Sequence, residues 1–236
     1  YGTGAFLVIN TGDVIRRSDA GLLSTLGWTD AAGTPSFCLE GSLFNAGTVI
    51  QWLRDGLQII DQAPQVNELA RSVPDSGGVM LVPAFTGWGT PHWDPQARGV
   101  LVGLTRDSGR GHIARAALEG IALSVATLVE LAEQSLGTGL GELAVDGGAA
   151  ASDPLLQAQA DCTGLTVRRP ASLESTARGV ALFAGLQAGV ISDLEQLATA
   201  RRDGAELFHP QMDASQRNRW RTRWQDAVSR SLGWHG

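Results

Sequence analysis

Two glycine-containing turns are the places in this sequence where bare main chain could bind a ligand. Asp146-Gly147-Gly148 follows a short apolar run at residues 143–145, and Asp153-Pro154 has the residue types that open a helix. A glycine pair between a strand and a helix lets main chain approach a ligand closely, because no Cβ stands in the way. Free N–H groups there suit an anion or a polar ring edge. Alone, this unit is a weak signal, since most such turns only connect elements.

The second turn lies at the other end of the sequence. Tyr1-Gly2-Thr3-Gly4 precedes a strand-like run at residues 5–9, and residues 10–13 have turn composition. A return strand from Val14 onward would complete a β-hairpin. The glycines beside Thr3 would expose N–H groups and a hydroxyl together, as a phosphate-contacting hairpin requires. On this feature alone, a simple hairpin with a flexible lead-in is the favoured interpretation.

A helix with broad apolar faces is predicted from Ser42 to about Ile60. Gly47 in its middle costs about 1 kcal/mol against Ala, so either another element or a flat ligand is expected to approach closely there. Gln51 lies one turn further along the same face and could hydrogen-bond a base. Close helix packing is the commoner explanation for such a glycine.

The composition limits the kinds of protein that this sequence can form. A chain of 236 residues, 43% of them hydrophobic and 18% charged, suits one large α/β domain or two small ones. The net charge of −6 argues against nucleic acid or an anionic membrane as the main partner. Cys38 and Cys162 have neither metal-binding nor redox spacing, which favours buried, reduced thiols in a cytoplasmic protein. We expect no membrane-spanning apolar run and no signal peptide.

All 18 cationic residues are arginines, which excludes three classes of enzyme. A Walker A loop places a lysine on the phosphates, and a protein kinase requires a strand lysine. Schiff-base chemistry requires a lysine amine. The four histidines are isolated from one another and from Cys or carboxylate partners at ligand spacing, so no metal site is predicted.

The rest of the chain alternates strands and helices around these turns. A Pro/Gly-rich aromatic loop at residues 86–95 has the composition of a lid or an interdomain contact. Small residues along one predicted helix, 176–190, would let it pack almost backbone to backbone against a neighbour. The Trp220 and Trp224 pair is interpreted as the inner face of the last helix rather than as a stacking platform for single strands. Strands are expected at 21–28, 35–39, 77–85, 99–105 and 164–168, and further helices at 111–136, 155–163, 194–202 and 215–232.

Several segments, in order, resemble the C-terminal domain of the glycerol kinases, which are members of the FGGY carbohydrate kinase family. The resemblance covers nearly the whole chain, and its most specific part is the run from Pro83 to Gly99. The matching segments are Tyr1-Gly2-Thr3-Gly4, Glu40-Gly41 with Gln51-Trp52-Leu53-Arg54-Asp55, residues 83–99, Gly103-Leu104-Thr105-Arg106, residues 112–119 and Val145-Asp146-Gly147-Gly148-Ala149.

This resemblance implies an α/β chain with the ribonuclease H-like, actin-like ATPase fold, a mixed sheet flanked by helices. Residues 1–236 would be one nucleotide-side lobe, whose partners are ATP with Mg²⁺, glycerol, an N-terminal lobe and a possible second copy. The implied contacts are Thr3 and Gly4 at the β- and γ-phosphates, Gly47 and Gln51 at the adenine and ribose, Gly147 and Gly148 at the sugar and α-phosphate, Ser152 near the base, and Phe6 at the glycerol carbons.

Two departures qualify the resemblance. The family often has Asn at the place of Ser152, so base recognition is expected to be weaker or water-mediated. The first phosphate loop, most glycerol contacts and the catalytic Asp belong to the N-terminal lobe in the family, and none of Asp94, Asp146 and Asp161 matches that base. The chain alone is therefore expected to bind the nucleotide but to be inactive as a kinase of ATP and glycerol.

Three other interpretations remain at this point. Another FGGY kinase, acting on a pentose or an alditol, would have much the same nucleotide lobe. A non-catalytic nucleotide-binding or scaffolding module could share the fold. Gly109-Arg110-Gly111-His112-Ile113-Ala114 also matches the dinucleotide fingerprint of dehydrogenases, although the strand before it is too distant and the helix after it too long.

Overall fold

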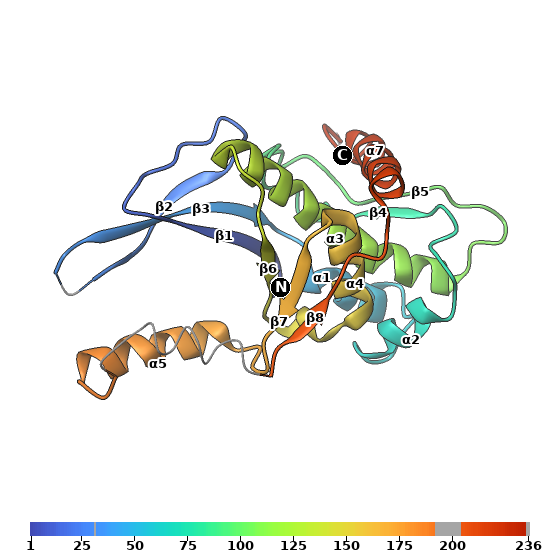
Figure 1. Ribbon diagram of the computed structural model, residues 1–236. Helices are drawn as coiled ribbons and strands as arrows, with labels where there is room; N and C mark the ends of the chain where they lie inside the picture. Colours follow the sequence, from blue (N-terminus) through green and yellow to red (C-terminus); the bar gives the residue numbers. More distant parts are fainter. Residues whose placement is uncertain (31, 192–203, 235–236) are drawn as a thin grey trace.

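One long helix and three small sheets organise the computed structural model, which describes residues 1–30, 32–191 and 204–234 (Figure 1). The strands pair in the orders β1-β3-β2, β4-β5 and β6-β7-β8. The elements are β1 (Ala5–Gly12), β2 (Leu23–Thr29), β3 (Pro35–Leu43), α1 (Gly47–Gln51), the π-helix η1 (Trp52–Gly56), α2 (Gln65–Arg71), β4 (Met80–Val82), β5 (Val100–Val102), α3 (Arg110–Leu136), β6 (Glu142–Ala144), the 3₁₀-helix η2 (Gly148–Ala151), α4 (Asp153–Thr163), β7 (Thr166–Arg169), α5 (Ser175–Gln187), β8 (Glu206–Phe208) and α7 (Ala214–Ser229).

The N-terminal sheet is antiparallel, but its pairing differs from the predicted hairpin. β1 pairs with β3, from Ala5 opposite Leu43 to Asn10 opposite Cys38. The predicted return strand at Val14 is wrong, because the segment after Gly12 bonds to itself: the Thr11 hydroxyl donates to the Val14 carbonyl at 2.9 Å. β2 pairs with β3 instead.

The two faces of this sheet have different surroundings. The inner face packs on α3, where a Cβ added to Gly41 would lie 3.0 Å from the Leu128 side chain. On the other face, Phe6 and Val8 of β1 are 63% and 58% exposed. The register places Glu40 opposite Val8 and also opposite Leu23, so these side chains share the open face. This sheet therefore has one buried face and one open, partly apolar face.

α3 is the centre of the core. Its predicted span, residues 111–136, is confirmed, and it ends at Gly137 with a left-handed φ of 69°. The expectation of no membrane-spanning run was wrong on length and composition, since α3 is long and apolar enough to qualify, but 78% of its most apolar stretch is buried inside the protein. At Gly120 an added Cβ would lie 2.1 Å from the Leu81 carbonyl oxygen, so β4 approaches the helix backbone directly. This is the packing of a core helix.

α7 covers another side of α3 through its tryptophans. Trp224 is 3% exposed, and its Nε1 donates to the Thr127 hydroxyl of α3 at 3.2 Å. Its ring lies 6.1 Å from that of Trp88. The inward orientation predicted for Trp224 is confirmed.

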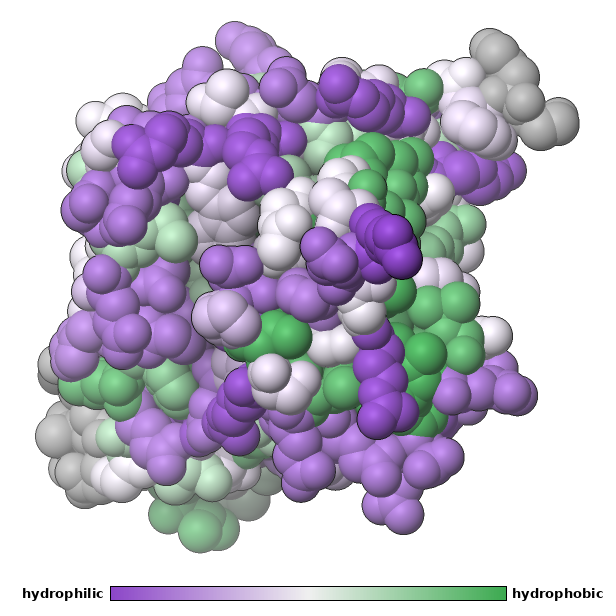
Figure 2. Space-filling model, turned by 90° about the vertical axis from the view of Figure 1, so that its right-hand side faces the viewer, coloured by the Kyte–Doolittle hydropathy of each residue, from purple (hydrophilic) through white to green (hydrophobic). Residues whose placement is uncertain are grey.

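Hydrophilic residues cover most of the face turned toward the viewer in Figure 2, and hydrophobic residues form separate patches on it.

The aromatic loop at residues 86–95 is fastened to the end of β3. Thr90 and Ser42 exchange two hydrogen bonds, from the Thr90 N–H to the Ser42 carbonyl (3.0 Å) and from the Ser42 N–H to the Thr90 hydroxyl (3.1 Å). The Trp93 Nε1 donates to the Gly21 carbonyl at 3.0 Å, and the Trp93 ring packs edge-on against Phe44. Residues far apart in the sequence are thus joined beside the open face of the first sheet.

Some predicted elements are shorter than expected, and others were missed. The single helix at 42–60 is replaced by the end of β3, then α1 and η1, because residues 40–43 continue the ladder with β1. α2 and β8 were not predicted. The expected helix at 194–202 lies outside the described residues. β5 pairs antiparallel with β4, so the Gly109–Ala114 motif lacks the parallel strands of a dinucleotide-binding unit.

α5 has the predicted position but not the predicted packing. None of its residues is buried. Val180 and Phe183 are 67% and 51% exposed. In Figure 1, α5 extends away from the other labelled helices. Within the described residues, an added Cβ on Gly185 would lie 2.6 Å from the Ile191 side chain, but one on Gly179 would meet nothing within 4 Å.

Candidate functional site

The turn at residues 1–4 is held against the start of α1 by main-chain hydrogen bonds. The Thr3 carbonyl accepts the N–H groups of Ala46 (2.9 Å) and Thr48 (3.3 Å), and Gly47 donates to the Gly2 carbonyl at 2.9 Å. A Cβ on Gly47 would lie 2.6 Å from that carbonyl oxygen. Of the two reasons expected for Gly47, close packing of another element is therefore the one observed.

The turn at residues 146–149 meets the same N-terminal segment. The Tyr1 nitrogen donates to the Asp146 carbonyl at 2.9 Å, and the Ala149 N–H donates to the Tyr1 carbonyl at 3.3 Å. Gly147 has a φ of 85°, and a Cβ there would lie 2.4 Å from the Tyr1 carbonyl oxygen. Only glycine fits this position. The two turns, about 145 residues apart in the sequence, thus lie side by side.

Unlike Gly147, Gly148 faces open space. A Cβ built there meets no other atom within 4 Å, and the residue is exposed. Thr3 is also exposed, although its carbonyl is fully engaged. In the parts of the chain that the structure describes, neither the Thr3 N–H, nor the Thr3 hydroxyl, nor the Gly148 N–H donates a hydrogen bond. Unused donors on two turns that meet at Tyr1 are suited to an anionic ligand.

The other predicted contacts are distributed around these donors. Gly4 is locked by packing, since its Cβ would lie 2.2 Å from the Leu43 carbonyl oxygen. Gln51 is exposed at the end of α1. Phe6 is on the open face of the first sheet. The structure therefore brings Gly47 against Gly2 and Gly147 against Tyr1, on either side of the segment that carries Thr3. Phe6 lies on the strand that follows this segment, and Gln51 lies on the helix that starts at Gly47.

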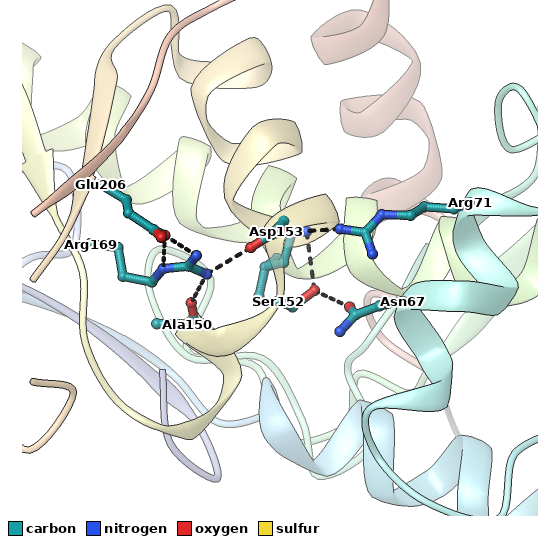
Figure 3. Close-up of polar contacts among 8 residues, drawn as sticks. Asn67, Arg71, Ala150, Ser152, Asp153, Arg169 and Glu206 are labelled. Atoms are coloured by element: carbon teal, nitrogen blue, oxygen red, sulfur yellow. Dashed lines mark hydrogen bonds and ion pairs between the residues drawn. The ribbon is translucent and has the colours of Figure 1, made fainter. Parts of the chain in front are cut away.

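Ser152 has a structural task that the sequence did not reveal. It is the N-cap of α4, with its Oγ accepting the Leu155 N–H at 3.3 Å, and it is 4% exposed. Its hydroxyl donates to Oδ1 of Asn67 on α2 at 2.6 Å (Figure 3). This hydroxyl is therefore buried and engaged, and the Asn67 side chain beside it is half-buried.

Arg169 braces the glycine turn from β7 (Figure 3). Its Nη1 donates to the Ala150 carbonyl at 3.1 Å and lies 2.9 Å from Oδ1 of Asp153, while its Nε donates to Glu206 at 2.9 Å. Arg71 of α2 binds the other oxygen of Asp153 at 3.0 Å. One carboxylate at the start of α4 therefore joins α2 to β7 across the turn.

Asn67 and Arg169 were missed by sequence reasoning, and no local signal could have found them. Asn67 lies 85 positions from Ser152, on a helix that was not predicted. Arg169 reaches Ala150 across 19 positions. Neither spacing belongs to a helix or strand period, so only the tertiary fold brings these pairs together.

Three other carboxylates are engaged in structural contacts. Backbone N–H groups of Gly233 and Gln96 lower the pKa of Asp94 below its usual value. Oδ1 of Asp161 accepts the N–H groups of Gln211 and Met212. Burial raises the pKa of Glu119, against hydrogen bonds from Arg115 and Ser76 that lower it. Among the described residues, no group of three or more His, Cys, Asp or Glu side chains could hold a metal ion.

Comparison with known proteins gives this site a family. Residues 1–188 match the model of the "FGGY family of carbohydrate kinases, C-terminal domain". The chain is 51% identical over 234 residues to a glycerol kinase of Aromatoleum aromaticum and 49% identical to one of Solidesulfovibrio magneticus, covering 99% of this chain and 47% of each relative.

A solved structure agrees with the sequence relatives. The glycerol kinase of Plasmodium falciparum with ADP superposes with a TM-score of 0.89 at 33% identity, covering 98% of this chain and 46% of that one. The chain spans about half the length of the curated relatives it matches. Its architecture is thus that of the actin-like ATPase fold of these kinases. The chain belongs to the FGGY family of carbohydrate kinases and carries its C-terminal domain.

Proposed function

We propose that this chain, residues 1–236, is the nucleotide-binding lobe of a glycerol kinase, which transfers the γ-phosphoryl group of ATP to glycerol and releases ADP and sn-glycerol 3-phosphate. The observation that carries the proposal is the meeting of two turns through Tyr1, with unused donors on Thr3 and Gly148. The near-half identity to glycerol kinases supports the choice of substrate over other FGGY kinases. The Plasmodium falciparum glycerol kinase was solved with ADP, which supports the choice of nucleotide.

In this proposal the main chain binds the phosphates and the side chains bind what lies beyond them. The Thr3 N–H and hydroxyl, with Gly4 behind them, donate to the β- and γ-phosphate oxygens. Gly147 and Gly148 let the α-phosphate and the sugar approach the backbone. Gly47 and Gln51 border the ribose and the base. Donors fixed by main-chain hydrogen bonds cost no reorganisation when charge moves during phosphoryl transfer.

Mg²⁺ would enter this site with the triphosphate. The groups that this chain turns toward the phosphates are N–H donors and a hydroxyl, without a carboxylate cluster in the described residues. Phosphate oxygens and groups outside the chain would therefore hold the ion. Bound there, Mg²⁺ would neutralise charge on the β- and γ-phosphates.

The other half of the reaction requires an N-terminal lobe. Phe6, on the open face of the first sheet, would contact the glycerol carbons from one side of a cleft. The base and the remaining glycerol contacts would come from the other side. We further infer that α5, which has no buried residue, packs against that lobe. Without that lobe, the isolated chain would bind ATP and ADP but would not phosphorylate glycerol. We also propose that the protein is soluble and cytoplasmic.

An ADP titration with Gly148→Val tests the site. Since a Cβ at Gly148 meets nothing within 4 Å, the added side chain should leave the melting temperature unchanged while it occupies the ligand's space. We expect calorimetry to show ADP binding to the unaltered chain and none to the variant. Undiminished affinity would place the site elsewhere.

A complementation assay tests the reaction. Adding the N-terminal half of the Aromatoleum aromaticum relative should produce ADP release that depends on glycerol. Release with xylulose or gluconate but not with glycerol would indicate another FGGY kinase. Nucleotide binding without release on any of these substrates would favour a non-catalytic nucleotide-binding module. Turnover of glycerol by the isolated chain would overturn the proposal that it is inactive.

A further inference from the structure

The amide of Asn67 contacts Ser152, four residues after Gly148 of the proposed nucleotide site, and has no role in the proposal so far. It projects from α2 toward Ser152, the residue at which the 3₁₀-helix η2 ends and α4 begins (Figure 3). η2 starts at Gly148, where the proposed site has open space. At about 2 Å per residue, the four steps from Gly148 to Ser152 span roughly 8 Å. That is the reach of a ribose and a base lying beyond an α-phosphate.

Hydrogen-bond geometry fixes which way this amide points. The Ser152 hydroxyl donates to Oδ1 of Asn67 at 2.6 Å, and its oxygen accepts the Leu155 N–H at 3.3 Å. This bond turns the amide oxygen toward Ser152 and Nδ2 away from it. No acceptor for Nδ2 is present among the residues that the structure describes. Oδ1 retains a second lone pair, because a carbonyl oxygen carries two.

The helix that carries Asn67 is itself anchored to the same place. Arg71 lies one turn further along α2 and binds Asp153, the first residue of α4, at 3.0 Å. Asn67 and Arg71, at i and i+4, therefore meet consecutive residues of the α4 start. Two contacts along one helix face hold the Asn67 amide in a fixed position rather than on a flexible loop.

Taking the proposed function as given, we propose that Asn67 recognises the nucleobase and makes the site selective for adenine over guanine. Nδ2 would donate to a ring nitrogen of adenine while Oδ1 accepts from its exocyclic amino group, as asparagine amides bind adenine elsewhere. Guanine presents an oxygen where adenine presents that amino group. With the amide in the orientation that the Ser152 hydrogen bond gives it, this guanine oxygen would face Oδ1, and two acceptors repel each other.

The test compares the affinities of the full chain for ADP and for GDP by calorimetry. The unaltered chain should bind ADP at least tenfold more tightly than GDP. Asn67→Ala should weaken ADP binding about tenfold and leave GDP binding nearly unchanged, so that the preference disappears. Asn67→Asp, which exchanges the donor for an acceptor, should lose ADP binding further.

Asn218→Ala is the matched control, because Asn218 is an exposed asparagine on α7. It should leave both affinities as they are, and the melting temperatures of all the variants should agree. An unchanged ratio of ADP to GDP affinity in Asn67→Ala would overturn the inference while leaving the proposed function intact. Failure of the unaltered chain to bind either nucleotide would overturn the proposed function, and this inference with it.

Discussion

Two helices of this chain are similar in composition but differ in burial. α3 and α5 are both rich in alanine and glycine, and close packing was expected of α5. In α3 the Gly120 backbone touches the Leu81 carbonyl of β4, and most of the helix is buried. In α5 an added Cβ on Gly179 meets no atom within 4 Å, and one on Gly185 meets the side chain of Ile191. Small residues thus indicate that a helix packs closely, but not which partner it packs against.

The difference also separates two parts of the proposed site. The turns on the phosphate side are held by hydrogen bonds within this chain, which connect residues 1–4 to the start of α1 and to residues 146–149. α5 and the open face of the first sheet are not completed, since Phe6, Val8, Val180 and Phe183 remain exposed. Leu173 connects the two parts: its carbonyl accepts the Gly147 N–H at 3.1 Å, two residues before α5 begins.

The largest difference in stability is expected between two variants that each add one methyl group, one in α3 and one in α5. Gly120→Ala forces a Cβ to 2.1 Å from the Leu81 carbonyl oxygen, and we expect it to lower the free energy of unfolding by about 3 kcal/mol. That corresponds to a melting temperature about 6–12 °C lower for a chain of this size. Gly179→Ala should leave the melting temperature unchanged, and its higher helix propensity should slow amide exchange within α5. Calorimetry measures the melting temperatures, and hydrogen exchange measures the protection of α5. Equal losses of melting temperature in the two variants would contradict the contrast between a packed α3 and an open α5.

The next effect tests what covers α5. Phe183→Asp places a charge on an exposed side chain, so the melting temperature of the chain alone should not change. If the N-terminal half of a relative packs there, the charge would be desolvated, and binding of the two halves should weaken about thirtyfold, or about 2 kcal/mol. Leu104→Asp is the control, since Leu104 is 54% exposed and follows β5, far from α5 in Figure 1. Equal binding by both variants would show that α5 is not part of that interface.

The sequence predicted the parts of the fold that depend on local patterns. α3, α4 and β7 lie close to their expected spans, because apolar periodicity and the Asp153-Pro154 signal act within a few residues, although the N-cap of α4 is Ser152 and not Asp153. The hairpin at Val14 failed because β1 pairs with β3 instead, whose residues lie 25 to 38 positions from their partners along the chain. Pairing between distant strands is set by the whole core and leaves no signal at the turn.

The site shows the same division. Gly147 could be identified from its glycine pair, since a positive φ is a local requirement. That residues 1–4 and 146–149 would meet followed only from the family resemblance. Asn67 and Arg169 escaped both routes, because their contacts depend on how α2 and β7 lie against the start of α4.

A smaller effect is expected from replacing Arg169, which contacts the turn region on the phosphate side. Its neighbour Arg168 serves as the comparison. Arg169→Met removes the contacts to Ala150, Asp153 and Glu206, so we expect a loss of about 1–2 kcal/mol in unfolding free energy. The loosened turn should also bind ADP about five- to tenfold more weakly. Arg168→Met is the control, because Arg168 pairs with Glu142 at 2.5 Å, away from the turn. If both variants bound ADP equally, Arg169 would have no part in shaping the site.

The smallest effect is expected in the alkylation rates of the two cysteines. Each thiol is buried, so it can react only after the surrounding structure opens. Burial raises the pKa values of both Cys38 and Cys162, so little reactive thiolate exists at pH 8. Cys162 is fully buried in α4, whereas Cys38 is 5% exposed in β3, on the face that carries Phe6. Local opening of the outer sheet should therefore expose Cys38 first, and Cys162 should react only with global unfolding. Mass spectrometry of alkylated peptides over time would measure the two rates. Faster reaction at Cys162 would mean that α4, and with it the glycine turn, opens more readily than the uncovered sheet.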